Sequence, residues 1–237
     1  RDSSSPHGTS NLVALEYMDT HSVDLLRSYR EEMGESSHVP PIPDTCQEVL
    51  YIELGAKEGE TLDTVYEEVD EVLQQFAIKD EATWAGFEES DHQAMKAFRH
   101  ALPERINSIV SERKKQIPDL TKIGTDMAVP DQHLATILDI YTKNLVGSDL
   151  EYYIFGHIGN SHVHINILPN DLEQQKKAWE LYSSFADTVV ELGGSVTAEH
   201  GIGKIKRKYI YKQYSRKDIE QMKQIKTIFD SKGLLNP

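Results

Sequence analysis

Polar and apolar side chains alternate most regularly in the run H-V-H-I-N-I-L, which starts at His162. A period of two places alternate side chains on opposite faces of a β-strand, so His162, His164 and Asn166 are predicted to share one face. Soluble domains do not usually line one strand face with imidazoles unless that face holds something. This strand is therefore the first candidate for a binding site.

The same patterns predict the other elements. Further strands are predicted at Leu12–Tyr17, Val49–Leu54, Ala82–Phe87, Leu150–Phe155 and Ser195–Thr197. Helices are predicted over Val23–Met33 with Ser22 as the N-cap, and over Thr61–Phe76, Asp91–Lys115, Gln132–Lys143, Asp171–Leu192, Lys204–Tyr214 and Lys217–Phe229. This order predicts an α+β fold: an antiparallel sheet with helices on one side, in two ferredoxin-like halves, plus a helical insert at about residues 90–145.

The charge balance narrows the partners of this 237-residue chain, which has 25 Lys and Arg residues, 39 Asp and Glu residues and a net charge of −14. Nucleic acids require a basic surface, so they are excluded as partners, and binding to an anionic membrane by charge alone is disfavoured. An anionic substrate could still be held by a few local cations. No apolar run approaches the roughly 18 residues of a membrane-spanning helix.

The single cysteine, Cys46, excludes a disulfide framework within the chain and fits a reducing compartment. We therefore expect a cytoplasmic protein, at most peripheral to a membrane. The chain starts at Arg1 without a methionine and stops abruptly at Pro237, so both ends are interpreted as cuts in a longer protein. The sequence leaves the oligomeric state open and allows a homodimer.

Candidate metal-binding and catalytic residues occur in two stretches of the sequence. His157 and His164 are seven residues apart across a predicted turn, and Glu199 follows the predicted strand at Ser195–Thr197. Two imidazoles and a carboxylate suit a divalent metal that meets its substrate directly. The residue types alone fit hydrogen-bonded sheet histidines equally well, because no compact motif such as H-E-x-x-H is present. His200 is a candidate general base, with a structural hydrogen-bond donor as the alternative.

Two cations are candidates for holding an anion. Arg99 could grip a carboxylate with two parallel hydrogen bonds, and Lys122 could supply a second positive charge. For either residue alone, a solvated surface charge is the commoner situation. No G-x-S-x-G is present, which removes the common serine-hydrolase interpretation.

The motif G-H-I-G-N-S-H-V-H-I-N-I-L-P, followed by V-T-A-E-H-G-I-G, resembles the C-terminal domain of the FAD-linked oxidases. These are flavoproteins of the vanillyl-alcohol-oxidase type, and they include D-lactate dehydrogenase, the glycolate oxidase flavin subunit and D-2-hydroxyglutarate dehydrogenase. The resemblance extends over nearly the whole chain, from L-E-Y-M-D-T-H-S-V-D-L-L-R through G-T-D-M-A-V-P to I-F-D-S-K-G-L-L-N-P.

The resemblance implies roles for individual residues. It makes His157, His164 and Glu199 the ligands of a divalent metal, zinc or manganese, and His200 the base that deprotonates the substrate hydroxyl as hydride passes to FAD. Substrate binding is implied for Arg99, Asn166 and Lys122, and contact with the flavin for Asn236. The chain departs from the family pattern at Asn160, Ser161 and His162, where Asp, Gly and Asn are usual, and at Pro103, where a substrate-contacting threonine is sometimes found. Lys122 is displaced in its spacing to Asp126 and Pro130.

The resemblance also implies that residues 1–237 are one substrate domain, and that the FAD-binding domain lies N-terminal to this chain. The expected function is that of an FAD-dependent D-2-hydroxy-acid dehydrogenase, which oxidises lactate-, glycolate- or 2-hydroxyglutarate-like acids to 2-oxo acids and passes electrons to an acceptor. The isolated domain is expected to be inactive. Two alternatives remain at this point: a self-contained metal-dependent hydrolase, and a non-catalytic module that binds a small acid.

Overall fold

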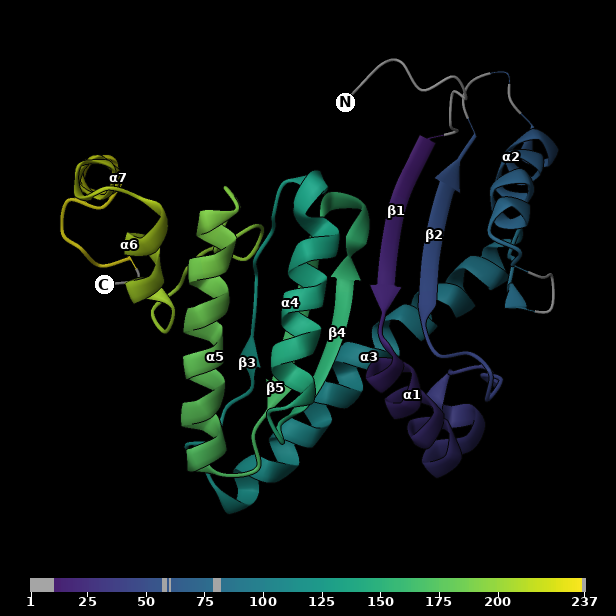
Figure 1. Ribbon diagram of the computed structural model, residues 1–237, viewed down its shortest axis with the longest axis horizontal. Helices are drawn as coiled ribbons and strands as arrows, with labels where there is room; N and C mark the ends of the chain where they lie inside the picture. The colour runs from purple at the N-terminus through teal and green to yellow at the C-terminus, as the bar shows by residue number, and fades with distance from the viewer. Residues whose placement is uncertain (1–10, 57–58, 60, 79–81, 236–237) are drawn as a thin grey trace. The chain divides into compact units, whose positions relative to one another are not determined.

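The computed structural model describes residues 11–56, 59, 61–78 and 82–235, and it confirms the predicted α+β fold (Figure 1). The strands are β1 (Asn11–Met18), β2 (Val49–Gly55), β3 (Ile123–Gly124), β4 (Glu151–His157) and β5 (His162–Leu168). The α-helices are α1 (Thr20–Met33), α2 (Leu62–Gln75), α3 (Glu89–Gln116), α4 (Leu134–Val146), α5 (Leu172–Glu191), α6 (Ile210–Gln213) and α7 (Arg216–Phe229). Short 3₁₀ helices are η1 (Gly34–Ser37), η3 (Asp131–His133), η4 (Ile158–Asn160) and η5 (Arg207–Tyr209).

The strand order is β2-β1-β4-β5-β3, with antiparallel pairing. The chain divides into two compact units. The first extends to Thr121 and includes Tyr152–Gly159, and the second comprises Lys122–Glu151 and the residues from Asn160 onward. The first unit therefore holds β1, β2 and nearly all of β4, while β3 and β5 belong to the second.

The first unit is built on β1 and its antiparallel neighbours. β1 pairs with β2 along its length, with one irregularity between Leu12 and Ala14, and with β4 at Tyr17 and Met18. α1 begins at Asp19, whose carboxylate accepts the backbone N–H of Ser22 at 2.9 Å. Helix α3 buries a stripe at four-residue spacing, as expected of an amphipathic helix, formed by Phe98, Leu102 and Ile106.

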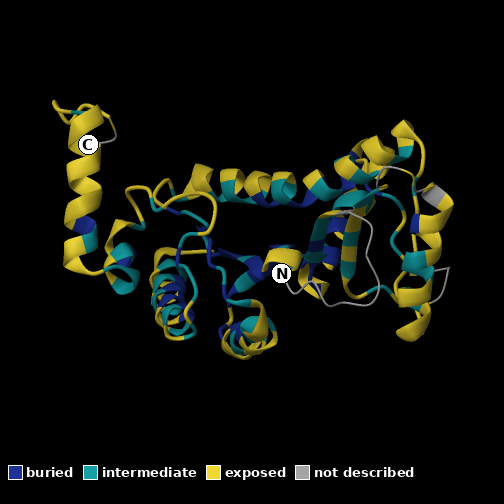
Figure 2. Ribbon diagram, turned by 90° about the horizontal axis from the view of Figure 1, so that it is seen from above, coloured by how far each residue is buried: buried dark blue, intermediate teal, exposed yellow. Residues whose placement is uncertain are grey.

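The second unit packs α4 and α5 together, and α5 also contacts β3 (Figure 1). Each helix buries one stripe, which in α4 contains Tyr141 and in α5 contains Phe185. The two rings meet edge to face with their centroids 4.8 Å apart. The apolar residues of β5 that alternate with its histidines, such as Ile165, are also buried. Coloured by burial, these elements supply much of the dark blue core, whereas α7 is mostly exposed (Figure 2).

We expect Phe185→Ala to be strongly destabilising. Phe185 is 1% exposed, so truncation removes a large buried ring and leaves a cavity beside Tyr141, at a cost of about 3–5 kcal/mol. Urea unfolding followed by circular dichroism measures the loss. The control is Val146→Ala in α4, where the side chain is 70% exposed, and it should change stability by less than about 0.5 kcal/mol. Equal stability of the two variants would contradict this description of the core.

Four element predictions were wrong in detail. The segment predicted as a strand at Ala82–Phe87 contains none, because it leads into the start of α3, where the backbone N–H groups of Phe87 and Glu88 both donate to Asp91 at 3.1 Å. The predicted N-cap of α1 at Ser22 is replaced by Asp19. The helix predicted over Lys204–Tyr214 is reduced to η5 and α6.

The strand predicted at Ser195–Thr197 is reduced to a single bridge between Ser195 and Ala128. The backbone N–H and carbonyl of Thr197 bond to the side chain of Ser195 rather than to a neighbouring strand. Among the residues that the structure describes, no helix is both long and apolar enough to cross a bilayer.

Candidate functional site

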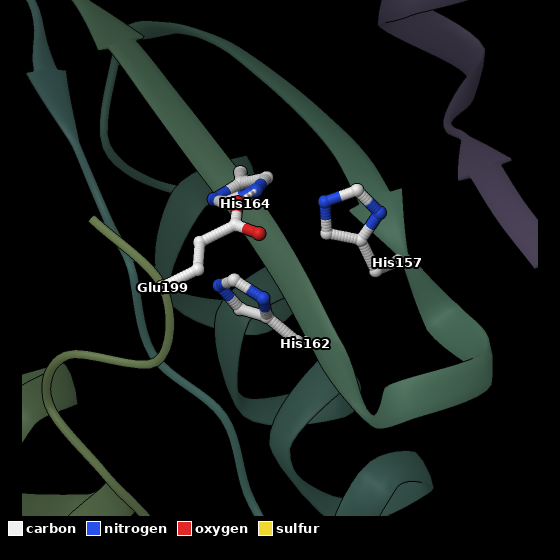
Figure 3. Close-up of side chains that lie close together, drawn as sticks. All are labelled: His157, His162, His164 and Glu199. Atoms are coloured by element: carbon white, nitrogen blue, oxygen red, sulfur yellow. Dashed lines mark ion pairs between the residues drawn. The ribbon is translucent and has the colours of Figure 1, made fainter.

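Three of the predicted site residues meet in the second unit around one carboxylate oxygen. Oε1 of Glu199 lies 3.2 Å from Nε2 of His164 and 2.9 Å from Nε2 of His200. His164 projects from β5, and Glu199 lies in the loop that follows the Ser195 bridge (Figure 3). The structure therefore brings together two sequence motifs that are 35 residues apart, counted from His164 to Glu199.

The orientation of His164 is set by the backbone. Its Nδ1 lies 3.1 Å from the carbonyl oxygen of Thr125. Because a carbonyl oxygen can only accept, Nδ1 must carry the proton, and Nε2 of the neutral ring then presents a lone pair toward Glu199. Metal-binding histidines are commonly fixed in this way, with one nitrogen donating to a carbonyl and the other facing the ion.

The donor set in this unit is suitable for a divalent cation. One ligand atom from each of Asp126, His164, Glu199 and His200 lies within 4.8 Å of the others. Imidazole nitrogen and carboxylate oxygen are the usual ligands of zinc and of related ions. His200 is the most exposed of the group at 67%, so its ring can meet a molecule arriving from solvent.

Asp126 is a site residue that the sequence reasoning did not identify. The carboxylate is 1% exposed, and it accepts the backbone N–H of Glu199 at 3.2 Å and that of His200 at 3.0 Å. The hydroxyl of Thr197 donates to it at 3.1 Å. Burial by itself would raise the pKa of Asp126, but these donors and the nearby His162 outweigh burial and lower it, which keeps the carboxylate ionised.

His162 adds to the same cluster from β5. Its Nε2 lies 3.1 Å from Oδ1 of Asp126, and its ring is edge-on to that of His164 with centroids 4.4 Å apart. The predicted shared face of His162 and His164 is therefore present, but the two residues face different carboxylates. His162, a departure from the usual family pattern, lies against the acid that holds the Glu199 loop.

The remaining metal candidate, His157, lies in the first unit with the predicted substrate ligand Arg99. Both contact Glu16 of β1: His157 through Nδ1 at 2.8 Å and Arg99 through a guanidinium nitrogen at 2.5 Å. The side chain of Glu16 is only 8% exposed. An ionised carboxylate can only accept, so Nδ1 of His157 is the donor, and Nε2 is the nitrogen that a metal ion would use. The sequence reasoning did not identify Glu16.

The other predicted substrate ligands belong to the second unit. Asn166 is buried in β5, where its backbone pairs with Gly124 of β3. Lys122 directly precedes β3, and its pKa is lowered first by burial and then by repulsion from Lys206. A half-buried lysine near another lysine favours an anion in its neighbourhood. Asn236 lies outside the described residues.

Comparison with known proteins identifies the family of this fold. Residues 7–237 match the family described as FAD linked oxidases, C-terminal domain. The chain belongs to this family. The resemblance predicted from the histidine motif and the E-H-G-I-G motif is thereby confirmed.

The curated relatives of this FAD-linked oxidase domain include several dehydrogenases. It is 29% identical over 172 residues to "D-2-hydroxyglutarate dehydrogenase" of Stutzerimonas stutzeri, covering 63% of this chain and 37% of that protein. It is 24% identical over 227 residues to "Glycolate oxidase subunit GlcD" of Bacillus subtilis, covering 95% and 44%. It is 27% identical over 188 residues to the mitochondrial "D-lactate dehydrogenase [cytochrome]" of Kluyveromyces lactis, covering 79% and 32%.

A solved structure shares the fold. It is a 4-ethylphenol oxidase from Gulosibacter chungangensis in complex with isoeugenol, with a TM-score of 0.58 and 15% identity. The match covers 94% of this chain and 46% of the oxidase. In all four comparisons, the chain spans less than half the length of the protein that it matches.

Proposed function

We propose that this chain is the substrate domain of an FAD-dependent D-2-hydroxy-acid dehydrogenase. The observation that carries the proposal is the pair of imidazole nitrogens around Oε1 of Glu199, at 3.2 Å from His164 and 2.9 Å from His200. Membership of the FAD-linked oxidase family supports it, as do relatives that are named as dehydrogenases of 2-hydroxy acids.

The proposed metal ligands are His157, His164 and Glu199, for zinc or manganese. In support, Glu16 and the carbonyl of Thr125 each hold the Nδ1 of one histidine, which makes Nε2 the nitrogen of each ring that would bind an ion. A bound divalent ion would polarise the hydroxyl and carboxylate of a hydroxy acid. The chemistry of the donor set fits such an ion.

His200 is the proposed general base. Oxidation of a 2-hydroxy acid to the 2-oxo acid removes a hydride from C2 and a proton from the hydroxyl group. FAD would supply the hydride acceptor when bound, and the hydroxyl proton needs a base on this chain. An exposed neutral imidazole next to Glu199 can accept that proton, and the adjacent carboxylate then stabilises the imidazolium. The histidine can afterwards release the proton to solvent.

Substrate positioning is proposed for Arg99, Lys122 and Asn166. On a chain with a net charge of −14, an anionic substrate needs local cations, and the half-buried Lys122 provides one. Arg99, which donates a hydrogen bond to Glu16, can also donate to the substrate carboxylate. Asn166 offers an amide from β5.

FAD is proposed to be bound mainly by a domain N-terminal to this chain, with Asn236 contributing a contact to the flavin. Residues 1–237 then form a single substrate domain with a helical insert at about residues 90–145, which is inactive by itself. An electron acceptor must reoxidise the flavin after each turnover. We also propose that the protein is cytoplasmic, or at most peripheral to a membrane, and that it forms a homodimer.

The proposed role of Glu16 gives a direct prediction. Glu16→Gln replaces the buried acceptor with an amide, so His157 is no longer held in one tautomer, and affinity for zinc or manganese should fall about 10–100-fold. Isothermal titration with either metal measures the change. The control is Glu53→Gln, an exposed acid on the neighbouring strand β2, which should bind metal like the wild type. Unchanged affinity in Glu16→Gln would argue against His157 as a ligand oriented by Glu16.

The experiment that tests the function uses the intact protein that carries this chain. Steady-state reduction of a dye acceptor is measured with the D and L enantiomers of lactate and 2-hydroxyglutarate, and with glycolate. We expect activity with at least one D-hydroxy acid or glycolate, and at least about tenfold lower kcat/KM for the corresponding L acid where one exists. Absence of activity with all of these acids would overturn the proposal. Ester or amide hydrolysis by the isolated chain would instead favour a metal-dependent hydrolase.

A further inference from the structure

The loop from Thr197 to His200 carries two proposed functional side chains without belonging to a helix or strand. Asp126 makes more hydrogen bonds to this loop than any other residue does among those that the structure describes. The side-chain oxygens of Asp126 accept from the N–H of Glu199 at 3.2 Å, the N–H of His200 at 3.0 Å and the hydroxyl of Thr197 at 3.1 Å. The backbone carbonyl of Asp126 accepts the N–H of Ala198 at 2.9 Å. Each of the four residues of this loop therefore donates a hydrogen bond to Asp126.

Asp126 is itself fixed from both sides. On one side, Thr125 bonds to Ile165 of β5 twice: its N–H donates to the Ile165 carbonyl, and its hydroxyl accepts the Ile165 N–H, each at 2.9 Å. On the other side, Ala128 and Ser195 exchange backbone hydrogen bonds of 3.0 and 2.8 Å. Asp126 therefore lies between the strand that carries His164 and the loop that carries Glu199.

We propose that Asp126 is the positioning residue that sets the Glu199 carboxylate and the His200 imidazole relative to His164. The proposal rests on the metal and base roles proposed above, and it assigns to Asp126 a role that acts through those residues. Asp126 bonds to the backbone N–H groups of Glu199 and His200, so it fixes the backbone positions from which these two side chains extend. The side chain of Ser195 also bonds to the backbone of Thr197, but the backbone N–H groups of Glu199 and His200 both donate to Asp126.

The alternative that Asp126 is itself a ligand fits the contacts less well. Each of its two oxygens already accepts a backbone N–H, and the side chain is 1% exposed. Thr197 and His162 also lie against these oxygens, at 3.1 Å each. A carboxylate offers about four lone-pair positions, and three of these already accept hydrogen bonds from the loop.

The test compares Asp126→Asn with wild type in the full 237-residue chain, first by amide hydrogen exchange, which needs no metal. Asparagine has the same shape, but its amide nitrogen cannot accept a backbone N–H. One of the two N–H groups therefore loses its acceptor and the other keeps only an uncharged one, so exchange at Glu199, at His200 or at both is expected to accelerate at least about tenfold. Asp19→Ala, which removes a different buried acid at the start of α1, should leave exchange at these two amides unchanged.

Cobalt(II) supplies the second readout, because its visible spectrum reports the geometry of its ligands. In Asp126→Asn, we expect at least about tenfold weaker cobalt binding and an altered spectrum, as for other residues that orient metal ligands. Thr197→Val should show a smaller loss in the same direction, and Thr197→Ser, which keeps the hydroxyl, should match the wild type. Asp19→Ala should bind cobalt like the wild type even where its stability is reduced.

The two readouts separate the two proposals. Unchanged exchange at Glu199 and His200 in Asp126→Asn overturns the positioning role, whatever the metal result. Faster exchange together with wild-type cobalt affinity and spectrum also overturns it, because the loop would then be free to move without effect on the ligands. If the wild-type chain binds no cobalt but exchange accelerates as expected, Asp126 still positions the loop, and the proposed metal site is what fails.

Discussion

Glu199→Ala in the intact protein is expected to lower kcat/KM for the hydroxy acid by at least about a thousandfold while the flavin stays bound. The change removes the carboxylate that faces both His164 and His200. Loss of a metal ligand forfeits several kcal/mol of transition-state charge stabilisation, and about 4 kcal/mol corresponds to a factor of a thousand. Metal analysis of the purified variant should show less than one tenth of the wild-type content.

The matched control for Glu199→Ala is Glu191→Ala at the end of α5, an exposed glutamate in the same unit. This variant should keep full activity and metal content. His164→Ala is expected to behave like Glu199→Ala, since both remove a ligand from the same cluster. Retention of wild-type turnover by either ligand variant would refute the assigned metal site.

His200→Gln is expected to reduce kcat by about a hundredfold to ten-thousandfold, the range of general base catalysis, with little change in metal affinity. Glutamine fills a similar volume but cannot take the hydroxyl proton. Because the ring of His200 is 67% exposed, added imidazole should reach the vacated position and restore part of the rate. His100→Gln, an exposed histidine on α3, serves as the control.

The two active-site variants differ in a way that identifies their roles. Loss of metal together with activity is expected at Glu199, whereas activity alone should fall at His200. If His200→Gln lost metal in parallel with activity, His200 would be a ligand, as its membership of the cluster of four possible ligands allows. A primary kinetic isotope effect with the C2-deuterated acid, retained in His200→Gln, would locate its role in proton rather than hydride transfer.

Much of the fold follows from local patterns. The alternation in β5 predicted a strand with its histidines on one face, and helices were predicted over Gln132–Lys143 and Asp171–Leu192, where α4 and α5 lie. These patterns are strong because burial selects apolar residues at the period of each element. The errors at Ala82–Phe87 and Ser195–Thr197 arose where side chains bond to the backbone: Asp91 accepts the N–H of Phe87, and the hydroxyl of Ser195 bonds to the backbone of Thr197.

The ligand candidates could also be found from the sequence, since His157, His164, Glu199 and His200 stand in two recognisable motifs. The two acidic residues that bond to these motifs, Glu16 and Asp126, could not be found from the sequence. Glu16 is 141 residues from His157, and Asp126 is 73 residues from Glu199. Nothing local marks either as different from the other acidic residues of the chain. Only the folded backbone shows that both are buried and hold functional side chains in place.

The most direct test of the account is single-turnover flavin reduction in the intact protein after metal removal. The protein is stripped with a chelator, mixed anaerobically with its best D-2-hydroxy acid, and followed by flavin absorbance, with and without added zinc or manganese. We expect reduction to be at least about a thousandfold slower without metal and to recover when one equivalent is restored. Flavin reduction at the full rate in the metal-free protein would contradict the proposed centre at His157, His164 and Glu199.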